Sequence, residues 1–61
     1  LARLFLARIQ VRLGKLESAR AHWRQGIRQL ALIAPPEVVK THTDEMRTTC
    51  KAEGVSPLDE H

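Results

Sequence analysis

Apolar residues lie on two sides of the helix that the first part of the chain predicts. At about 100° per residue, residues 2–13 form one apolar stripe, and a second apolar group gathers roughly opposite it. The stripe consists of Ala2, Phe5, Leu6, Ile9 and Leu13. The opposite group is centred on Leu4 and Val11, with Leu1 and Ala7 at its margins. One side can pack on the next helix of the chain. We expect the side of Leu4 and Val11 to contact a longer parent chain or a partner.

The strongest amphipathic pattern in the chain lies over residues 16–33, where the apolar positions share one narrow helical face. That face carries Leu16, Ala19, Trp23, Ile27 and Leu30. Gly14 separates this helix from the first, because glycine readily adopts the left-handed conformation that ends a helix. Pro35 and Pro36 end the second helix and begin a third, because proline is unfavourable inside a helix and favoured at its first position. We expect Trp23 to lie in the core.

A third helix is predicted over residues 36–53. Its less apolar face carries Val39, His42, Met46 and Cys50. The three segments predict an all-α fold, in which an antiparallel helical hairpin and a third helix form one module over residues 1–54. Residues 55–61 are expected to form a polar tail or the start of a further helix, because Ser56 and Pro57 suit an N-cap and a first helical position.

The hairpin resembles a tetratricopeptide repeat. The resemblance rests on small and aromatic residues with the spacing that this family uses where paired helices touch. These residues are Leu6, Ala7, Gly14, Ala19, Trp23, Gly26 and Ile27. It covers about residues 3–34, one repeat, and implies a fragment of a helical array that binds other proteins. The chain departs from the family at Arg3, Gln10 and Lys15, where Trp, Tyr and an acidic cap are usual. A different three-helix bundle, such as a microtubule-interacting-and-transport module, is an alternative.

Length and cysteine content restrict the ways in which the chain can be stabilised. Its 61 residues allow one small domain, whose stability is marginal without a partner. The single cysteine, Cys50, cannot form an internal disulfide. Apolar runs fall far short of the roughly 20 residues of a membrane-spanning helix. We therefore expect a soluble, cytoplasmic protein without a membrane segment.

Charge is distributed unevenly along the chain. The formal net charge is +3. Residues 1–33 contain most of the lysines and arginines and only one acidic residue, Glu17, whereas acidic residues outnumber basic ones in residues 34–61. The contrast favours docking of an acidic segment or an acidic partner against the basic hairpin.

Arginines supply the candidate polar contacts. Arg20, Arg24 and Arg28 follow an i, i+4, i+8 spacing along one flank of the second helix, and the first helix adds Arg8 and Arg12. Aligned guanidinium groups can bind carboxylates or phosphates, although a solvated helix flank has the same pattern. Nucleic acid is disfavoured because the only aromatic residues, Phe5 and Trp23, both lie on predicted core faces, which leaves no stacking platform.

The spacing of the potentially reactive residues does not support a catalytic site or a metal site. His42, Met46 and Cys50 share a helical face, but the outer two are separated by about 12 Å along the helix axis. That separation disfavours both a shared metal ion and a nucleophile paired with a base. The adjacent Asp44 and Glu45 diverge around the helix, which disfavours paired-carboxylate catalysis. We therefore expect no enzyme activity, no cofactor and no metal site.

The sequence predicts a protein-interaction module within a larger protein or complex. Its expected partner is another protein, a peptide or its own copy in a homodimer, with acidic character. The predicted partner-binding residues are Leu4, Val11, Arg8, Arg12, Arg20, Arg24 and Arg28. The alternative is a small basic module that binds nucleic acid or other polyanions through the arginines. A purely structural segment, packed against its parent chain, is a third interpretation.

Overall fold

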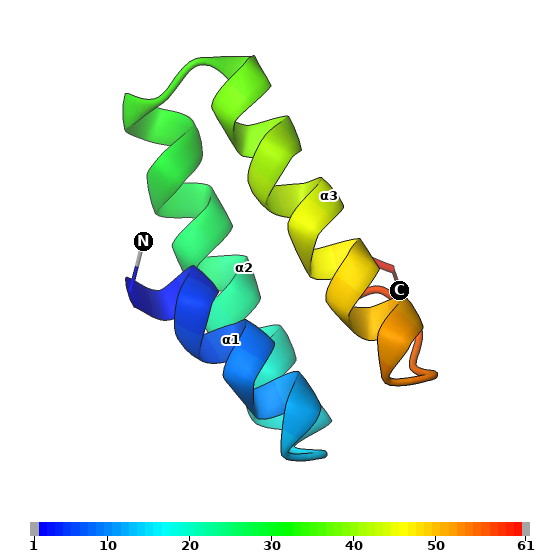
Figure 1. Cartoon of the computed structure of the whole chain (residues 1–61). Coiled ribbons are helices and arrows are strands. Elements are labelled where there is room, and N and C mark those ends of the chain that lie inside the picture. The colour runs from blue at the N-terminus through cyan, green and yellow to red at the C-terminus, as the bar shows by residue number, and fades with distance from the viewer. Residues whose placement is uncertain (1, 61) are drawn as a thin grey trace.

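Three helices make up most of the chain in the computed structural model, which describes residues 2–60. They are α1 (Ala2–Arg12), α2 (Leu16–Ile33) and α3 (Pro36–Ala52). No strand occurs in the described residues. α1 and α2 form an antiparallel hairpin, and α3 returns alongside them in the direction of α1 (Figure 1). The prediction of an all-α hairpin with a third helix is confirmed, and each helix boundary lies within one residue of its predicted position.

Glycine ends two of the helices in the same way. Gly14 and Gly54 have φ of +78° and +71°, the left-handed conformation that glycine adopts without strain. After α1, the Lys15 N–H donates to the Gln10 carbonyl at 2.9 Å and the Gly14 N–H to the Val11 carbonyl at 3.1 Å. The equivalent pair of bonds follows α3 at Gly54 and the next residue. Both ends are Schellman motifs, so both predicted helix ends are confirmed.

The turn between α2 and α3 depends on its two prolines. Ala34 is extended, and its N–H still donates to the Leu30 carbonyl at 2.9 Å. Pro35 occupies the N-cap position of α3 with ψ of 156°, and Pro36 is the first helical residue. Because neither proline has an N–H to leave unpaired, the chain can end one helix and start the next within a few residues.

The hydrophobic core draws side chains from all three helices and from the segment that follows them. Its buried apolar residues are Leu4, Ala7, Val11, Ala19, Trp23, Leu30, Met46, Cys50 and Leu58. Ala7 and Ala19 are completely buried, on α1 and α2 respectively. Gly26 of α2 is buried against Leu4. Small residues therefore line the contact between α1 and α2 and allow the two backbones to approach closely.

The predicted orientation of α1 is wrong. Leu4 and Val11, expected to face outward, are each only 2% exposed, whereas Phe5 and Leu13 of the opposite side are 64% and 65% exposed. Both sides are apolar, so hydrophobicity alone does not choose between them. The side with Ala7 at its centre fits against the small residues of α2, and the bulkier side would hold the helices apart.

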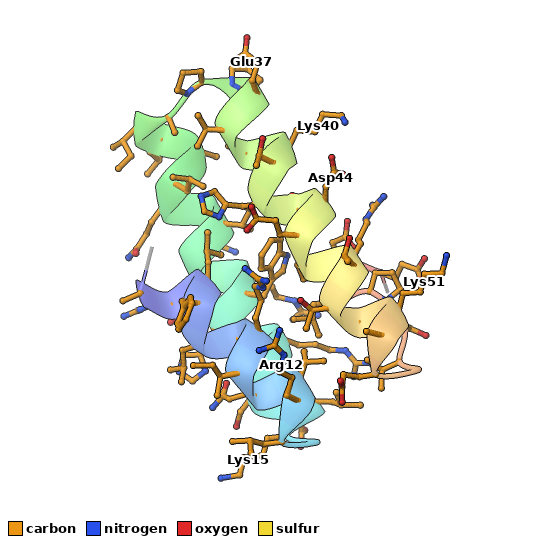
Figure 2. All side chains as sticks on the ribbon, in the orientation of Figure 1. Arg12, Lys15, Glu37, Lys40, Asp44 and Lys51 are labelled. Atoms are coloured by element: carbon orange, nitrogen blue, oxygen red, sulfur yellow. The ribbon has the colours of Figure 1, made fainter. Side chains whose placement is uncertain are left out.

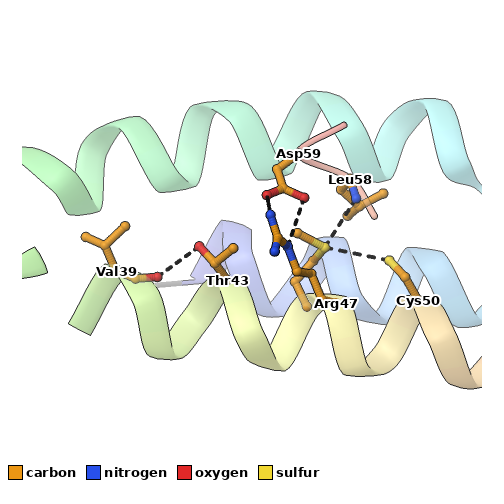
Figure 3. Close-up of polar contacts among 7 residues, drawn as sticks. Val39, Thr43, Arg47, Cys50, Leu58 and Asp59 are labelled. Atoms are coloured by element: carbon orange, nitrogen blue, oxygen red, sulfur yellow. Dashed lines mark hydrogen bonds and ion pairs between the residues drawn. The ribbon is translucent and has the colours of Figure 1, made fainter. Parts of the chain in front are cut away.

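Residues 55–60, which we call the tail, form no fourth helix. The tail folds back between α2 and α3, and Leu58 is 2% exposed (Figure 3). Figure 3 shows this segment on the side of the α2–α3 pair that faces away from α1. Of the two predictions for this region, an irregular segment is therefore the observed one, but it is anchored by an apolar residue. Residue 61 lies outside the described residues.

No helix among residues 2–60 combines the length and the apolar character that crossing a membrane requires. Charged side chains project from the outer surfaces instead. Figure 2 shows Lys40 and Asp44 on the outer side of α3 and Arg12 on α1. The Lys40 Nζ and Asp44 Oδ2 atoms are 3.2 Å apart, an i, i+4 ion pair.

Replacing Gly26 with alanine is expected to destabilise the fold. A Cβ at this position would lie 2.8 Å from Leu4 Cδ2 and 3.2 Å from Arg3 Cβ. Alanine normally gains about 1 kcal/mol over glycine inside a helix, but overpacking costs about 1–3 kcal/mol. Urea denaturation of Gly26→Ala should therefore show a net loss of about 1 kcal/mol in the free energy of unfolding.

Leu4→Ala supplies the control for this prediction. With the leucine removed, Gly26→Ala should cost less than it does in the wild type, so a double-mutant cycle should report a favourable coupling between the two changes. Additive effects, or a stabilised Gly26→Ala single variant, would contradict the close approach.

Candidate functional site

Four exposed apolar side chains lie on one side of α1. They are Phe5, Leu6, Ile9 and Leu13, which we call the α1 stripe. Leu6 and Ile9 are 39% and 38% exposed, and Phe5 and Leu13 are exposed further still. Phe5, Ile9 and Leu13 follow one another at i, i+4 and i+8, so they lie along one line of the helix. Contiguous exposed apolar side chains on a small protein are typical of an interaction surface.

A pocket of about 320 Å³ adjoins the α1 stripe at Phe5. Its lining comes from all three helices: Leu4, Phe5, Arg8, Trp23, His42 and Glu45. Two charged residues border it, and the Arg8 Nη1 and Glu45 Oε2 atoms are 3.1 Å apart. The Arg8 Nε also donates to Thr49 Oγ1 at 3.2 Å. The stripe therefore continues into a hollow whose charged border fixes α1 to α3.

The predicted arginines do not form one surface. Arg8 is half-buried and engaged with Glu45 and Thr49. Arg20 and Arg24 border a separate pocket of about 290 Å³, together with Ser56 and Glu60 of the tail.

The two other predicted arginines, Arg12 and Arg28, are exposed. Within residues 2–60, neither they nor Arg20 and Arg24 have a carboxylate within ion-pair distance. The α1 arginines and the α2 arginines therefore lie on separate parts of the surface. Arg8 of α1 contacts α3, whereas Arg20 and Arg24 of α2 lie beside the tail.

Trp23 is 2% exposed, as expected of a core residue, but it also borders the pocket beside the α1 stripe. Phe5 is the reverse case. It was expected in the core and is instead exposed. Phe5 is exposed because the opposite side of α1 fits more closely against α2. The spacing of apolar residues along α1 does not predict which of its two apolar sides is buried.

The shared face of His42, Met46 and Cys50 belongs mainly to the core. Met46 and Cys50 are completely buried, and the Cys50 thiol donates to Met46 Sδ at 3.7 Å (Figure 3). His42 is half-buried beside the pocket. Among residues 2–60, no three His, Cys, Asp or Glu side chains are placed to hold a metal ion. Burial raises the pKa of the Cys50 thiol, which keeps it protonated and unreactive.

The residues that sequence reasoning missed are those of the tail. Leu58 is buried, and Asp59 accepts two hydrogen bonds from Arg47, from Nη2 at 2.6 Å and from Nε at 3.4 Å (Figure 3). Two signals pointed to this docking. They are the spacing of Val55 and Leu58, the only large apolar residues in an otherwise polar segment, and the charge contrast between the two halves of the chain.

Comparisons with protein-family models, curated proteins and solved structures gave no match to this chain.

Cys50 should lower the stability of the fold at high pH. Because burial raises its pKa in the folded state, the unfolded chain loses the thiol proton first as the pH rises through about 9. The free energy of unfolding of the wild type should therefore fall above that pH, relative to Cys50→Ala. Alkylation of the native thiol at pH 8 should be at least tenfold slower than in concentrated urea. Equal alkylation rates would show that the thiol is accessible.

Proposed function

We propose that this chain is a protein-interaction module that binds an apolar helix of a partner along the α1 stripe. The observation that supports this most directly is the exposure of four apolar side chains on α1 while its opposite side is committed to the core. Neither side of the helix is then left polar. A helix with this composition is stabilised when a second apolar surface covers it.

The spacing of the stripe suits helix-to-helix docking. Side chains at i, i+4 and i+8 interdigitate with the grooves of a partner helix. Complete burial of one leucine, isoleucine or phenylalanine contributes about 1.5–3 kcal/mol. Four such side chains contribute at most about 6–12 kcal/mol, and less here because Leu6 and Ile9 are already partly buried. Since much of this energy offsets the cost of association, we expect weak binding that strengthens with each further contact the partner makes. The exposed Arg12 next to Leu13 favours an acidic partner and a faster encounter.

The predicted resemblance to a tetratricopeptide repeat supports this proposal. Helical hairpins of repeat proteins stack on their neighbours, and each buries its apolar face against the next unit. A neighbouring hairpin, in the same chain or in a second copy, is therefore one partner of the required shape. In a second copy the stripe would pair with itself across a two-fold axis.

Polyanion binding through the α2 arginines is the competing function. The exposed Arg24 and Arg28 support it. Against it, Arg20 is half-buried and borders a pocket together with Ser56 and the acidic Glu60 of the tail, so the α2 flank is not a uniformly basic surface. Such binding would weaken steeply with salt and would not respond to changes in the α1 stripe.

The decisive comparison is between variants of two exposed apolar sites. Phe5→Glu with Ile9→Glu places charge in the α1 stripe, and Leu32→Glu with Ile33→Glu places the same charge at the exposed end of α2, where these side chains are 82% and 85% exposed. Sedimentation equilibrium should show self-association of the wild type that the stripe variant weakens at least tenfold and the α2 variant preserves. Amphipathic helical peptides selected from a displayed library should show the same ranking.

Circular dichroism of these variants checks that the fold is retained, because exposed substitutions change stability little. A wild type that stays monomeric to millimolar concentration and yields no stripe-dependent peptide would contradict the proposal. Steep salt dependence of binding to a polyanion, lost in Arg24→Glu with Arg28→Glu, would support the competing function instead.

A further inference from the structure

α2 and α3 form a groove on the side of the pair that faces away from α1. The chain's own tail occupies it, as Figure 3 shows for Leu58 and Asp59. The tail contains no helix or strand, and one internal backbone hydrogen bond crosses its turn, from the Glu60 N–H to the Pro57 carbonyl. Its attachment to the groove therefore depends mainly on side chains.

Leu58 provides the apolar part of this attachment. Its side chain belongs to the core cluster, and its backbone N–H donates to Met46 Sδ at 3.2 Å. Trp23 and Ile27 border the same region on α2. The tail does not fill this region, because a pocket of about 180 Å³ stays open between Leu58 and α2. The groove has room for a side chain larger than leucine.

Carboxylates provide the polar part. Arg47 on α3 donates from Nε and Nη2 to the two carboxylate oxygens of Asp59. This two-bond geometry suits a planar carboxylate. Glu60 lies by Arg20 and Arg24 of α2. Arg47 thus pairs with Asp59, whereas Arg20 and Arg24 have no carboxylate within ion-pair distance among residues 2–60. The tail places one buried apolar residue followed by two acidic residues beside these cations, and it leaves the α2 arginines free to pair with a better-placed second carboxylate.

We infer that the α2–α3 groove is a docking site for a short extended segment of another protein, in which a large apolar residue precedes two carboxylates. The tail is then an internal occupant that competes with this segment. A tethered segment has an effective concentration of about millimolar, so an outside segment displaces it by making additional contacts. The open space beside Leu58 provides for such contacts. This inference concerns a different surface from the α1 stripe and does not depend on the proposed function.

The test uses the full chain and a defined peptide probe, Val-Ser-Pro-Phe-Asp-Glu, which repeats the tail with phenylalanine in place of leucine. Trp23, the only tryptophan, borders the groove and reports binding by its fluorescence. The variant Leu58→Ser with Asp59→Ser releases the tail and should bind the peptide at least tenfold more tightly than the wild type. Adding Arg47→Ala should weaken that binding at least fivefold.

Two matched peptides identify the contacts. One carries serine in place of phenylalanine, and the other carries Asn-Gln in place of Asp-Glu. Each should bind the released variant at least tenfold more weakly than the probe. A released variant that is helical by circular dichroism but shows no binding, or binds all three peptides equally, overturns the inference.

Measurements on the wild type keep the inference testable if the released variant does not fold. Excess probe peptide should shift the Leu58 methyl resonances toward those of an exposed leucine, and unchanged resonances overturn the inference. A wild type that forms dimers by exchanging tails, without binding the peptide, also overturns it, because the occupant is then a second copy. Phe5→Glu with Ile9→Glu should bind the peptide like the wild type, which separates this site from the α1 stripe.

Discussion

The close approach of α1 to α2 determines the rest of the structure. It depends on residues with little or no side chain, because Ala7, Ala19 and Gly26 leave no bulk between the two backbones. Leu4 then fits directly over Gly26, and α1 is rotated so that its larger apolar residues point away from the core. The exposed stripe is therefore a consequence of how the hairpin packs, and it could not be moved inward without separating the helices.

Local chemistry made much of this fold predictable. Gly14, Pro35, Pro36 and Gly54 each act through their own backbone conformation, so the helix ends could be read without knowledge of the tertiary contacts. The face of α2 was equally clear, because Ala19, Trp23 and Leu30 share one side of the helix and are all buried. Both features depend on residues that are close together in the sequence.

The rotation of α1 and the docking of the tail were not predictable in the same way. Two apolar sides of α1 compete, and steric fit against α2 selects the one with smaller residues. Leu58 and Val55 are the only large apolar residues in a polar segment, and two positions are too few to form a periodic pattern that marks Leu58 as part of the core. The predicted contact residues Leu4 and Val11 consequently lie on the side of α1 that is buried in the core. The five arginines do not form one surface: Arg8 borders the pocket beside Phe5, Arg20 and Arg24 border a pocket at the tail, and Arg12 and Arg28 are exposed elsewhere on α1 and α2.

Trp23 borders both the pocket next to the α1 stripe and the open space beside the tail. Trp23 therefore forms part of the wall of both pockets. In a domain of this size, a core side chain can reach more than one surface pocket. One aromatic side chain thus contributes apolar surface to two pockets, and a ligand in either pocket would contact the same core residue.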